Sequence, residues 1–580
     1  MTSYITHEIH PKLQYIKCIY DRSIIALSMA SVRVLLIKKR SYNSLRKSLQ
    51  VILRPWISLS LSTTSVRGEL FKSVPEQTVP VEGKIQGSLP DWLSGKLIRN
   101  GPGLYEIGDT KLNHWFDGMA LLHSFTIKSG KVFYASKFLR SDAYTKNMAT
   151  NRLVVSEFGT GAVPDPCMTL FERVQSYFTS LTDPSTKITD NCLVNVWPAG
   201  DKYIASTESD FVHVFSPETL DAQQKIQLSK HVAVNSATAH PHIDDDGTLY
   251  NLGSSANGYT IIKISPTGKD SHVMDKASVL CDVPPKNKLK PGYSHSFGAT
   301  ENYFVLLEQP FCFNLPKVMK DTLLNKPTIP DKMFEWQENE LIRFFIVEKS
   351  SGNILPRKFF APTGMVLHHI NAYEDKGHIV LDVCGYDNGR VYSTLTLEAM
   401  NSGIVEGDIF ANPRRYVLPI DQTLHDATKV NLVTLDYTEA TAQLQEDGSI
   451  LCQPESISEK SFELPRIHYE KFNGRPYQFV YGLNQTFEDL IKTDVKTKKC
   501  LTWSEDGCSV SEPVFVGKPE SSGEDDGVIL SAVLRVDESQ PPFLLVLDAR
   551  TMTEMARVEF PGIQWHKDVH GIFVPTSALE

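Results

Sequence analysis

The sequence has no long apolar run and no paired cysteine motif. No stretch reaches the roughly 20 apolar residues that a membrane-spanning helix requires, and Gly101-Pro102-Gly103 does not match the G-x-G-x-x-G pattern of a dinucleotide site. The nine cysteines are scattered and never arranged as C-x-x-C, which excludes a zinc cage and a disulfide framework and is typical of reduced intracellular thiols. The 580 residues, 41% of them hydrophobic, are enough for a large globular core.

Acidic residues are almost absent from the start of the chain. Residues 1–68 contain 11 Lys and Arg against Glu8 and Asp21, a net charge of +9, whereas the other 512 residues carry −18. So acidic a core is a poor nucleic-acid binder, because duplex binding requires basic patches. The basic head is typical of an organelle-targeting segment, with an unfolded basic extension or an imperfect gene model as the alternative. We therefore divide the chain into a basic extension, residues 1–70, and a single domain, residues 71–580.

The domain has the pattern of an all-β protein. Short runs rich in Val, Ile, Phe and Tyr are separated by acid-Gly turns, and four of these turns, at Gly247, Gly377, Gly448 and Gly527, precede an apolar run and predict tight hairpins. Their separations of 130, 71 and 79 residues favour a unit of about 70 residues, which suits a seven-bladed β-propeller. A large sandwich or two β domains remain alternatives at this stage.

Helical patterns are scarce. The strongest predicted helix is Met168–Leu181, whose apolar residues recur at spacings of three and four, and a weaker one is Leu315–Leu324. Each could pack on the sheets, or present an apolar surface that dips into a membrane.

Four of the 17 histidines lie inside or at the end of apolar runs: His240, His295, His368 and His570. Their separations of 55, 73 and 202 residues are not those of a zinc finger, so a shared site has to be assembled from distant strands. A propeller allows this, because the innermost strand of each blade directs side chains toward one axis. Taken singly, a strand histidine is more often a core residue than a ligand, so the pattern alone leaves both interpretations open.

Several long, ordered motifs resemble those of the carotenoid cleavage oxygenase family, and in particular its animal branch. They are Arg99–Gly103, His114–His123, Ser156–Thr160, Pro164–Cys167, His240–His242, Glu524–Ser531 and His570–Phe573. The resemblance extends from about residue 80 to residue 574, which is nearly the whole chain outside the basic head.

The resemblance implies a seven-bladed propeller capped by loops and helices, with one iron(II) ion on its axis. It assigns the four iron ligands, which are also the catalytic residues, to His240, His295, His368 and His570, and prefers His368 to its neighbour His369. It assigns the carboxylates that hold three of these rings to Glu208, Glu463 and Glu512. Four neutral imidazoles leave coordination positions for dioxygen, and an outer carboxylate fixes the tautomer and orientation of its ring.

The activity that the resemblance implies is cleavage of a carotenoid by dioxygen alone, at the central 15,15′ bond of β-carotene, into two retinal aldehydes. Eccentric 9′,10′ cleavage, a retinoid isomerohydrolase, and a catalytically silent carotenoid-binding propeller are the alternatives. A substrate of this kind lives in membranes, which favours peripheral membrane contact, and Cys167 matches a cysteine that is lipidated in some relatives. We expect no nucleic-acid partner, no obligate protein partner, and a cytoplasmic or mitochondrial location.

Overall fold

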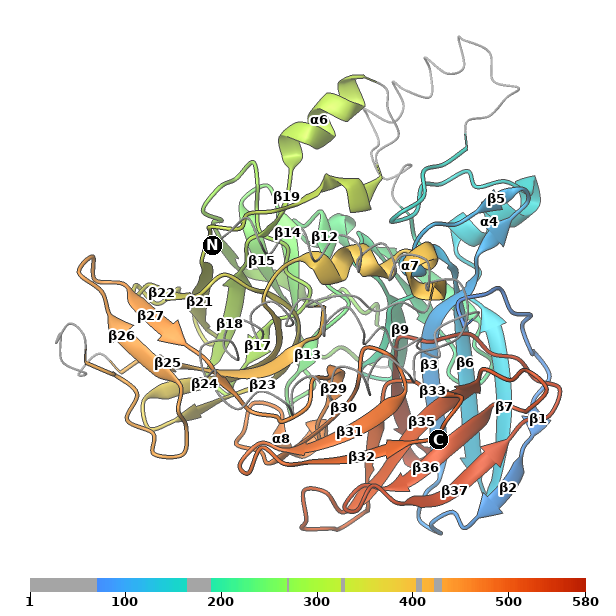
Figure 1. Cartoon of the computed structure of the whole chain (residues 1–580). Helices are drawn as coiled ribbons and strands as arrows, with labels where there is room; N and C mark the ends of the chain where they lie inside the picture. Colours follow the sequence, from blue (N-terminus) through green and yellow to red (C-terminus); the bar gives the residue numbers. More distant parts are fainter. Residues whose placement is uncertain are drawn as a thin grey trace, which may run out of the picture. The chain divides into compact units, whose positions relative to one another are not determined.

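The computed structural model describes residues 70–163, 189–268, 271–324, 329–402, 409–421 and 430–579. Within these ranges strands far outnumber helices, so the predicted all-β class is confirmed. Seven sheets of four to six strands follow one another along this part of the chain, and we number them first to seventh in that order (Figure 1).

The first three sheets come from the N-terminal half of the chain, and the order of strands below is their order in space. The first contains β1 (Val81–Glu82), β7 (Lys131–Phe138), β6 (Met119–Lys128), β3 (Gly95–Leu104) and β38 (His570–Pro575). The second contains β11 (Ala222–Gln227), β10 (Phe211–Phe215), β9 (Lys202–Ser206) and β8 (Asn195–Ala199). The third contains β12 (Ser236–Ala237), β14 (Leu249–Ser255), β15 (Gly258–Ile264) and β16 (Ala277–Val283), with β13 (His242–Ile243) also paired to β14.

The next two sheets occupy the middle of the chain. The fourth contains β17 (Gly298–Ala299), β18 (Tyr303–Glu308), β21 (Ile342–Glu348), β22 (Phe359–Ala361), β27 (Ile450–Gln453) and β26 (Thr441–Leu444). The fifth contains β23 (Met365–Asp375), β24 (His378–Tyr386), β25 (Asn412–Pro419) and β28 (Glu455–Ser456).

The last two sheets are C-terminal. The sixth contains β29 (Glu463–Arg466), β30 (Phe479–Leu483), β31 (Asp489–Asp494) and β32 (Cys500–Ser504). The seventh contains β2 (Lys84–Gly87), β37 (Glu554–Glu559), β36 (Phe543–Asp548), β35 (Gly527–Arg535) and β33 (Cys508–Val510), with β34 (Val514–Gly517) also paired to β35. Two short hairpins lie outside these sheets: β4 (Glu106–Ile107) with β5 (Thr110–Lys111), and β19 (Phe311–Phe313) with β20 (Phe334–Trp336).

The hydrophobic core lies between successive sheets. One buried cluster joins the second and third sheets, and others join the third to the fourth, the fourth to the fifth and the fifth to the sixth. A further cluster joins the seventh sheet back to the first, and the largest contains residues of the first, second, sixth and seventh. Every sheet is therefore covered by apolar side chains on both faces.

Strand β18 shows how the sequence encodes this packing. Phe304 and Leu306 face the third sheet, whereas Val305 and Leu307 face the fifth. Side chains alternate between the two faces of a strand, so a strand buried on both faces is a continuous apolar run. This is why the strongest strands of the domain lack the regular polar alternation of a half-exposed sheet.

The first and last sheets contain strands from both ends of the domain. β3 pairs antiparallel with β38, and β2 pairs antiparallel with β37. Asn100 lies opposite His570 in the first of these pairs, and Arg99 lies opposite Gly571. The C-terminal strand β38 is thus held in the first sheet by its pairing with β3.

Three of the four predicted acid-Gly turns are hairpin turns. Gly247, Gly377 and Gly448 have φ of +79°, +75° and +79° and connect β13 to β14, β23 to β24 and β26 to β27. The prediction at Gly527 is wrong, because this glycine is the first residue of β35 and pairs with Gly517. A Cβ atom at Gly527 would lie 2.3 Å from the carbonyl oxygen of Val516, so close strand packing, not a turn, requires the glycine there.

In the part of the chain that the structure describes, the helices lie in the connections between strands. They are α4 (Asp142–Thr150), α6 (Leu315–Leu323), α7 (Leu397–Asn401) and α8 (Tyr469–Phe472), with 3-10 turns η1 (Trp115–Asp117), η3 (Leu228–Lys230), η4 (Pro330–Met333), η5 (Arg390–Leu395) and η6 (Thr576–Ala578). The predicted helix Leu315–Leu324 is confirmed as α6, which projects beyond the sheets at the top of Figure 1. The predicted helix Met168–Leu181 and Cys167 lie outside the described residues. None of the helices in the described part of the chain is both long and apolar enough to cross a membrane.

Candidate metal centre

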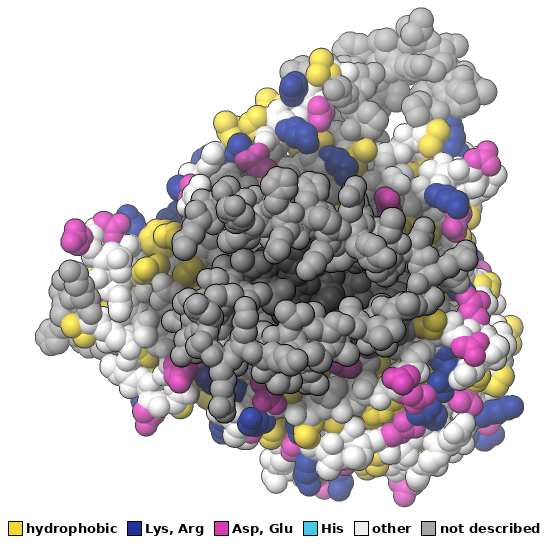
Figure 2. Space-filling model, in the orientation of Figure 1, with side chains coloured by type: hydrophobic (Ala, Val, Ile, Leu, Met, Phe, Trp, Pro, Cys, Tyr) yellow, Lys and Arg dark blue, Asp and Glu magenta, His cyan; other side chains and the backbone are white. Residues whose placement is uncertain are grey.

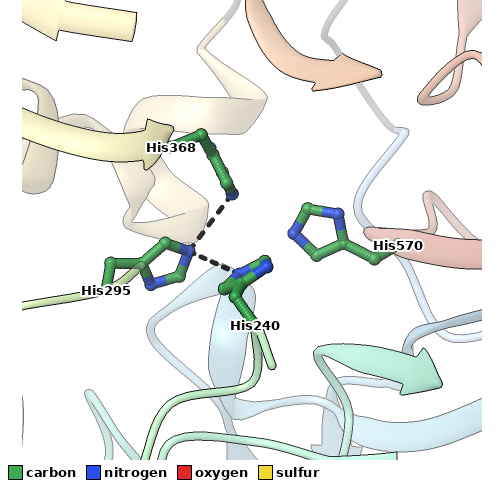
Figure 3. A group of neighbouring side chains, drawn as sticks. All are labelled: His240, His295, His368 and His570. Atoms are coloured by element: carbon green, nitrogen blue, oxygen red, sulfur yellow. Dashed lines mark hydrogen bonds between the residues drawn. The ribbon is translucent and has the colours of Figure 1, made fainter. Parts of the chain in front are cut away.

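The structure brings together the four histidines that the sequence singles out. His240 lies between β12 and β13, His295 lies just before β17, His368 is in β23, and His570 begins β38. Their side chains point toward one another from the third, fourth, fifth and first sheets (Figure 3). One ring nitrogen from each lies within 4.8 Å of the corresponding nitrogens of the others, and this is a group that could hold a metal ion.

The rings meet through their Nε2 atoms. His295 Nε2 lies 2.9 Å from His240 Nε2 and 3.2 Å from His368 Nε2. The ring centroid of His570 lies 4.7 Å from that of His240 and 5.2 Å from that of His368. Three of the four residues are buried, and His240 is half-buried.

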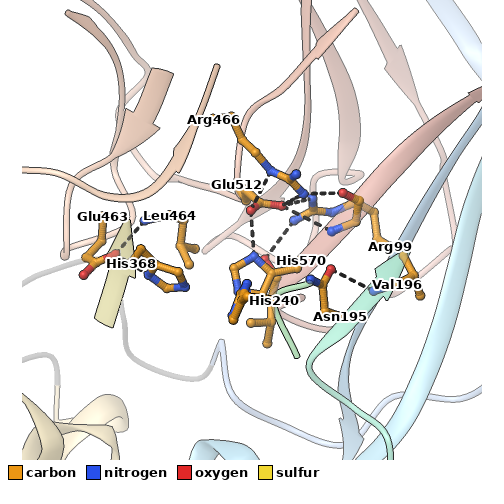
Figure 4. Close-up of polar contacts among 12 residues, drawn as sticks. Arg99, Asn195, Val196, His240, His368, Glu463, Leu464, Arg466, Glu512 and His570 are labelled. Carbon is orange, nitrogen blue, oxygen red and sulfur yellow. Dashed lines mark hydrogen bonds and ion pairs between the residues drawn. The ribbon is translucent and has the colours of Figure 1, made fainter. Parts of the chain in front are cut away.

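Three of the rings are held from behind by carboxylates. His368 Nδ1 lies 2.6 Å from Glu463 Oε2, and His570 Nδ1 lies 2.7 Å from Glu512 Oε1 (Figure 4). His295 Nδ1 bonds Glu208 in the same way. A carboxylate partner keeps the proton on Nδ1 and leaves the Nε2 lone pair directed at the centre. These are the three carboxylates that the family resemblance implies.

The choice between His368 and His369 follows from the backbone of β23. The pairing of β23 with β24 shifts register between Val366 and His369, and the two histidine side chains leave the strand in different directions. His369 Nδ1 bonds Ser296 Oγ at 2.7 Å, whereas His368 joins the cluster. The structure thus places His368, and not its neighbour, among the converging rings.

Side-chain amides fix the segments that carry the histidines. Gln309 Nε2 donates to the carbonyl oxygens of Tyr293 at 2.8 Å and Val366 at 3.1 Å, which ties the His295 segment to the start of β23. Asn195 Nδ2 donates to the carbonyl oxygen of Ala239 at 2.8 Å, directly before His240. The converging geometry therefore rests on hydrogen bonds that are buried or part-buried.

Two of the rings, those of His240 and His570, are neutral at physiological pH. Burial, and next the three other histidines, hold the pKa of His240 well below its usual range. Burial lowers the pKa of His570 to about 4, although Glu512 opposes this shift. Neutral imidazoles are the form that binds a metal ion.

Two arginines hold Glu512. Arg99 Nη1 lies 2.7 Å from Glu512 Oε2, and Arg466 Nε lies 2.9 Å from Oε1. Arg99 also pairs with Asp568 at 2.8 Å, and Asp568 accepts from His123 at 3.0 Å. Burial alone would raise the pKa of Glu512, but Arg466, His570 and Arg99 hold it far below its usual value. Glu512 is thus a fixed carboxylate anion behind His570.

A group of aromatic side chains leads away from the centre. Tyr293 lies 6.1 Å from His295 between ring centroids, and Phe334 lies 5.3 Å from Tyr293. Tyr392 and Phe311 pack on both, and Phe313, which precedes α6, lies 5.4 Å from Phe334. An aromatic surface therefore connects the histidines with the base of α6.

Sequence reasoning missed four residues of this centre: Arg99, Arg466, Tyr293 and Tyr386, whose hydroxyl donates to Glu463 Oε1 at 2.8 Å. Tyr293 stands two residues before His295, so a period-two pattern could have placed both on one side of an extended segment. Arg99 lies within a motif that resembles the family, but its partner Glu512 is 413 residues away. Arg466 and Tyr386 carry no local pattern that separates them from other strand residues.

The comparisons with known proteins show the family to which the chain belongs. The sequence model of the RPE65 family, described as retinal pigment epithelial membrane protein, matches residues 70–575. The chain belongs to this family of carotenoid oxygenases. The match covers every residue of the centre described above.

Two curated members of the RPE65 family are similar over most of their length. The chain is 41% identical over 519 residues to β,β-carotene 15,15′-dioxygenase of Mus musculus, which covers 87% of this chain and 90% of that protein. It is 42% identical over 527 residues to the mitochondrial carotenoid-cleaving dioxygenase of Macaca fascicularis, covering 87% and 94%. Both relatives are dioxygenases by name, and the two identities are nearly equal.

A solved structure shares the fold. A variant of the apocarotenoid oxygenase of Synechocystis superimposes with a TM-score of 0.68 at 21% identity, and the match covers 88% of this chain and 98% of that one. The cobalt-substituted form of that oxygenase gives a TM-score of 0.66. At this identity the likeness shows the fold alone.

Proposed function

We propose that this chain is an iron(II)-dependent dioxygenase that cleaves the central 15,15′ double bond of β-carotene into two retinal aldehydes. The observation that carries the proposal is the convergence of one ring nitrogen from each of four histidines, three of which are held by carboxylates. Membership in the RPE65 family and 41% identity to a β,β-carotene 15,15′-dioxygenase support the reaction and the substrate.

The side chains fit a resident metal ion. The carboxylates keep the protons of His295 and His368 on Nδ1, so two Nε2 lone pairs face each other across 3.2 Å. Such an approach is unfavourable for neutral rings and becomes favourable around a cation. His240, His295, His368 and His570 would hold the ion, and Glu208, Glu463 and Glu512 would orient three of them. Iron(II), when bound, would supply the activation of dioxygen.

The chain's own residues supply the environment for an apolar polyene. The side chains of Tyr293, Phe311, Phe334 and Tyr392 form a continuous aromatic surface beside His295. Aromatic side chains bind a conjugated chain through its apolar faces, and they stabilise positive charge that develops on it during cleavage. A carotenoid lying on this surface would be directed toward the histidines.

We also assign the fold as a seven-bladed propeller with one blade per sheet. The support is the core between successive sheets, the cluster that joins the seventh sheet to the first, and the closing pair β3–β38. In such a ring the edge strands β12, β17, β23 and β38 are innermost, which accounts for the meeting of their histidines. The connections that carry α4, α6 and α7 would form the cap. Residues 71–580 are then one domain, and residues 1–70 are an extension.

The same proposal includes contact with a membrane surface at α6. Leu289, Met319 and Leu324 are 55%, 62% and 55% exposed, and Leu289 accepts the Leu315 N–H at the start of α6. Apolar and basic side chains lie together over α6 (Figure 2). This combination favours a surface with anionic lipids. We expect Met319→Ser to reduce flotation with phosphatidylserine vesicles. The control is Val536→Ser, because Val536 is an exposed apolar residue that follows β35 and lies outside α6.

Eccentric 9′,10′ cleavage is the second candidate. The 42% identity to a mitochondrial carotenoid-cleaving dioxygenase and the net charge of +9 in residues 1–68 favour it and a mitochondrial location.

The candidates are distinguished by chromatography of the products that purified protein, loaded with iron(II), forms from β-carotene and dioxygen. Retinal alone supports central cleavage, and an apo-carotenal with an ionone supports eccentric cleavage. Absence of both, with a retinyl ester converted to 11-cis-retinol, would replace the proposal with an isomerohydrolase. Carotenoid binding with no product from either substrate would leave a non-catalytic carotenoid-binding propeller.

A further inference from the structure

Two of the carboxylates behind the histidines, Glu208 and Glu463, each have a tyrosine hydroxyl as a second partner. Tyr293 Oη lies 2.8 Å from each oxygen of Glu208, and Tyr386 Oη donates to Glu463 Oε1 at 2.8 Å. Glu512 differs, because arginines hold it. Tyr386 is 1% exposed and Glu463 is 6% exposed, so water does not substitute for the phenol in that pair.

The two oxygens of Glu463 have separate partners. Oε2 accepts from His368 Nδ1 at 2.6 Å and from the Leu464 N–H at 2.9 Å. Oε1 accepts from Tyr386, and no other donor to it is present in the described part of the chain. A buried charged oxygen without a donor is unfavourable, so loss of this hydroxyl would turn the carboxylate and the ring bound to it.

The hydroxyl also affects the chemistry of the ring. A carboxylate that accepts a hydrogen bond at one oxygen is a weaker base at the other, and it draws the Nδ1 proton of its histidine less strongly. Removing the donor makes the imidazole richer in electrons. The phenol therefore influences both the direction of the Nε2 lone pair and its donor strength.

We propose that Tyr386 and Tyr293 are positioning residues of the metal centre, which hold Glu463 and Glu208 and thereby set the orientation and donor strength of His368 and His295. The inference rests on the proposed function only in requiring that the four histidines hold a divalent ion. It assigns the tyrosine hydroxyls no contact with the ion or the substrate.

The test is Tyr386→Phe, which removes one oxygen and keeps the ring. Cobalt(II) is titrated into metal-free protein without substrate, and both the affinity and the visible absorption of the complex are recorded. Because the loss of orientation of His368 outweighs the gain in donor strength, we expect the affinity to fall about 10-fold, the lower end of the effect of losing an outer partner. We also expect the cobalt absorption bands to shift. The matched control is Tyr477→Phe, because Tyr477 Oη donates at 2.7 Å to Asp382, a buried carboxylate paired with Arg415. That variant should keep the affinity and spectrum of the parent protein.

Parent-like affinity and spectrum in Tyr386→Phe, with metal binding by the parent intact, would overturn the inference and leave the proposed function standing. A parent protein that binds no cobalt would overturn both. If Tyr386→Phe shows no cooperative thermal unfolding, the same titration is made on Tyr293→Phe. The partner of Tyr293, Glu208, is 27% exposed, so the loss of one hydrogen-bond donor to it costs less stability. A change of affinity and spectrum in that variant supports the inference, and parent-like values overturn it.

Discussion

His570 lies directly opposite Asn100 in the antiparallel pair between β38 and β3. Asn100 Nδ2 in turn donates to the carbonyl oxygens of Cys192 at 2.8 Å and Asn195 at 3.2 Å, at the start of the second sheet. A histidine near the end of the domain is thus fixed by a residue near its beginning, and the centre depends on contacts between remote segments.

The adjacent histidines of β23 give a matched pair of variants. We expect His368→Ala to abolish iron binding and turnover, because its Nε2 lies in the cluster, and His369→Ala to retain both, because His369 bonds Ser296. Iron content per chain, measured after desalting, checks the prediction. A full complement of iron in His368→Ala would remove that residue from the ligand set.

Glu463 orients His368, and its replacement tests whether the carboxylates behind the histidines support metal binding. We expect Glu463→Gln to weaken iron retention by roughly 10–100-fold, because the amide is a poorer acceptor for the Nδ1 proton. Dialysis against a graded series of chelator concentrations measures the loss. Equal retention by the variant and the parent would mean that the 2.6 Å contact with His368 does not support the metal.

Asp382 and Arg415 form a buried ion pair away from the centre. Both Asp382 oxygens accept from Arg415 at 2.8 Å, and the two side chains are 0% and 4% exposed. We expect Asp382→Asn to lower the free energy of unfolding by about 3–5 kcal/mol, since it leaves a buried guanidinium uncompensated. Urea unfolding checks this, while iron content should stay unchanged. A loss of iron at full stability would contradict the structural role.

His566 makes stability depend on pH. Burial, and next His123, hold the pKa of His566 well below 6.5, and neither ring nitrogen has a hydrogen-bond partner among the described residues. The unfolded chain therefore takes up a proton below pH 6.5 that the folded chain does not, and stability is lost as the pH falls. The slope is about 1.4 kcal/mol per pH unit. We expect His566→Phe to flatten the slope of unfolding free energy between pH 6 and 5, and parallel curves would contradict this.

Deletion of the basic extension tests its role. We expect deletion of residues 1–68 to leave turnover of β-carotene in detergent unchanged and to alter the location of the protein in cells, because the net charge of +9 lies in this segment. Turnover and fractionation measure the two effects. A folded but inactive product would show that the extension contributes to the enzyme.

The sequence allowed the all-β class, the strands and the four histidines to be predicted, but for different reasons. Apolar runs and acid-Gly turns are local patterns, and they identify hairpins such as the one at Gly377. Gly527 carries the same pattern but lies in a strand, because close approach to Val516 also requires a glycine. The histidines were identified from motifs that resemble a family, and not from their spacing.

Other features have no local pattern that sequence reasoning could use. Helix α4 was missed because its residues show little apolar periodicity. Its first turn is capped by the Ser141 side chain, which accepts the Tyr144 N–H. Asp190, from a remote part of the chain, accepts the Asp142 and Ala143 N–H groups. The phenol contact between Tyr386 and Glu463 joins positions 77 residues apart. Such contacts depend on which sheets become neighbours, and this is decided by packing across the whole domain.

The pairing of β3 with β38 has a consequence for synthesis on the ribosome. About 470 residues separate Asn100 from His570, so one edge of β3 has no partner strand until nearly the whole domain has emerged. An unpaired edge is prone to join the strands of other chains. The nascent protein would therefore need chaperone protection over this interval, and metal loading would be a late, post-translational event.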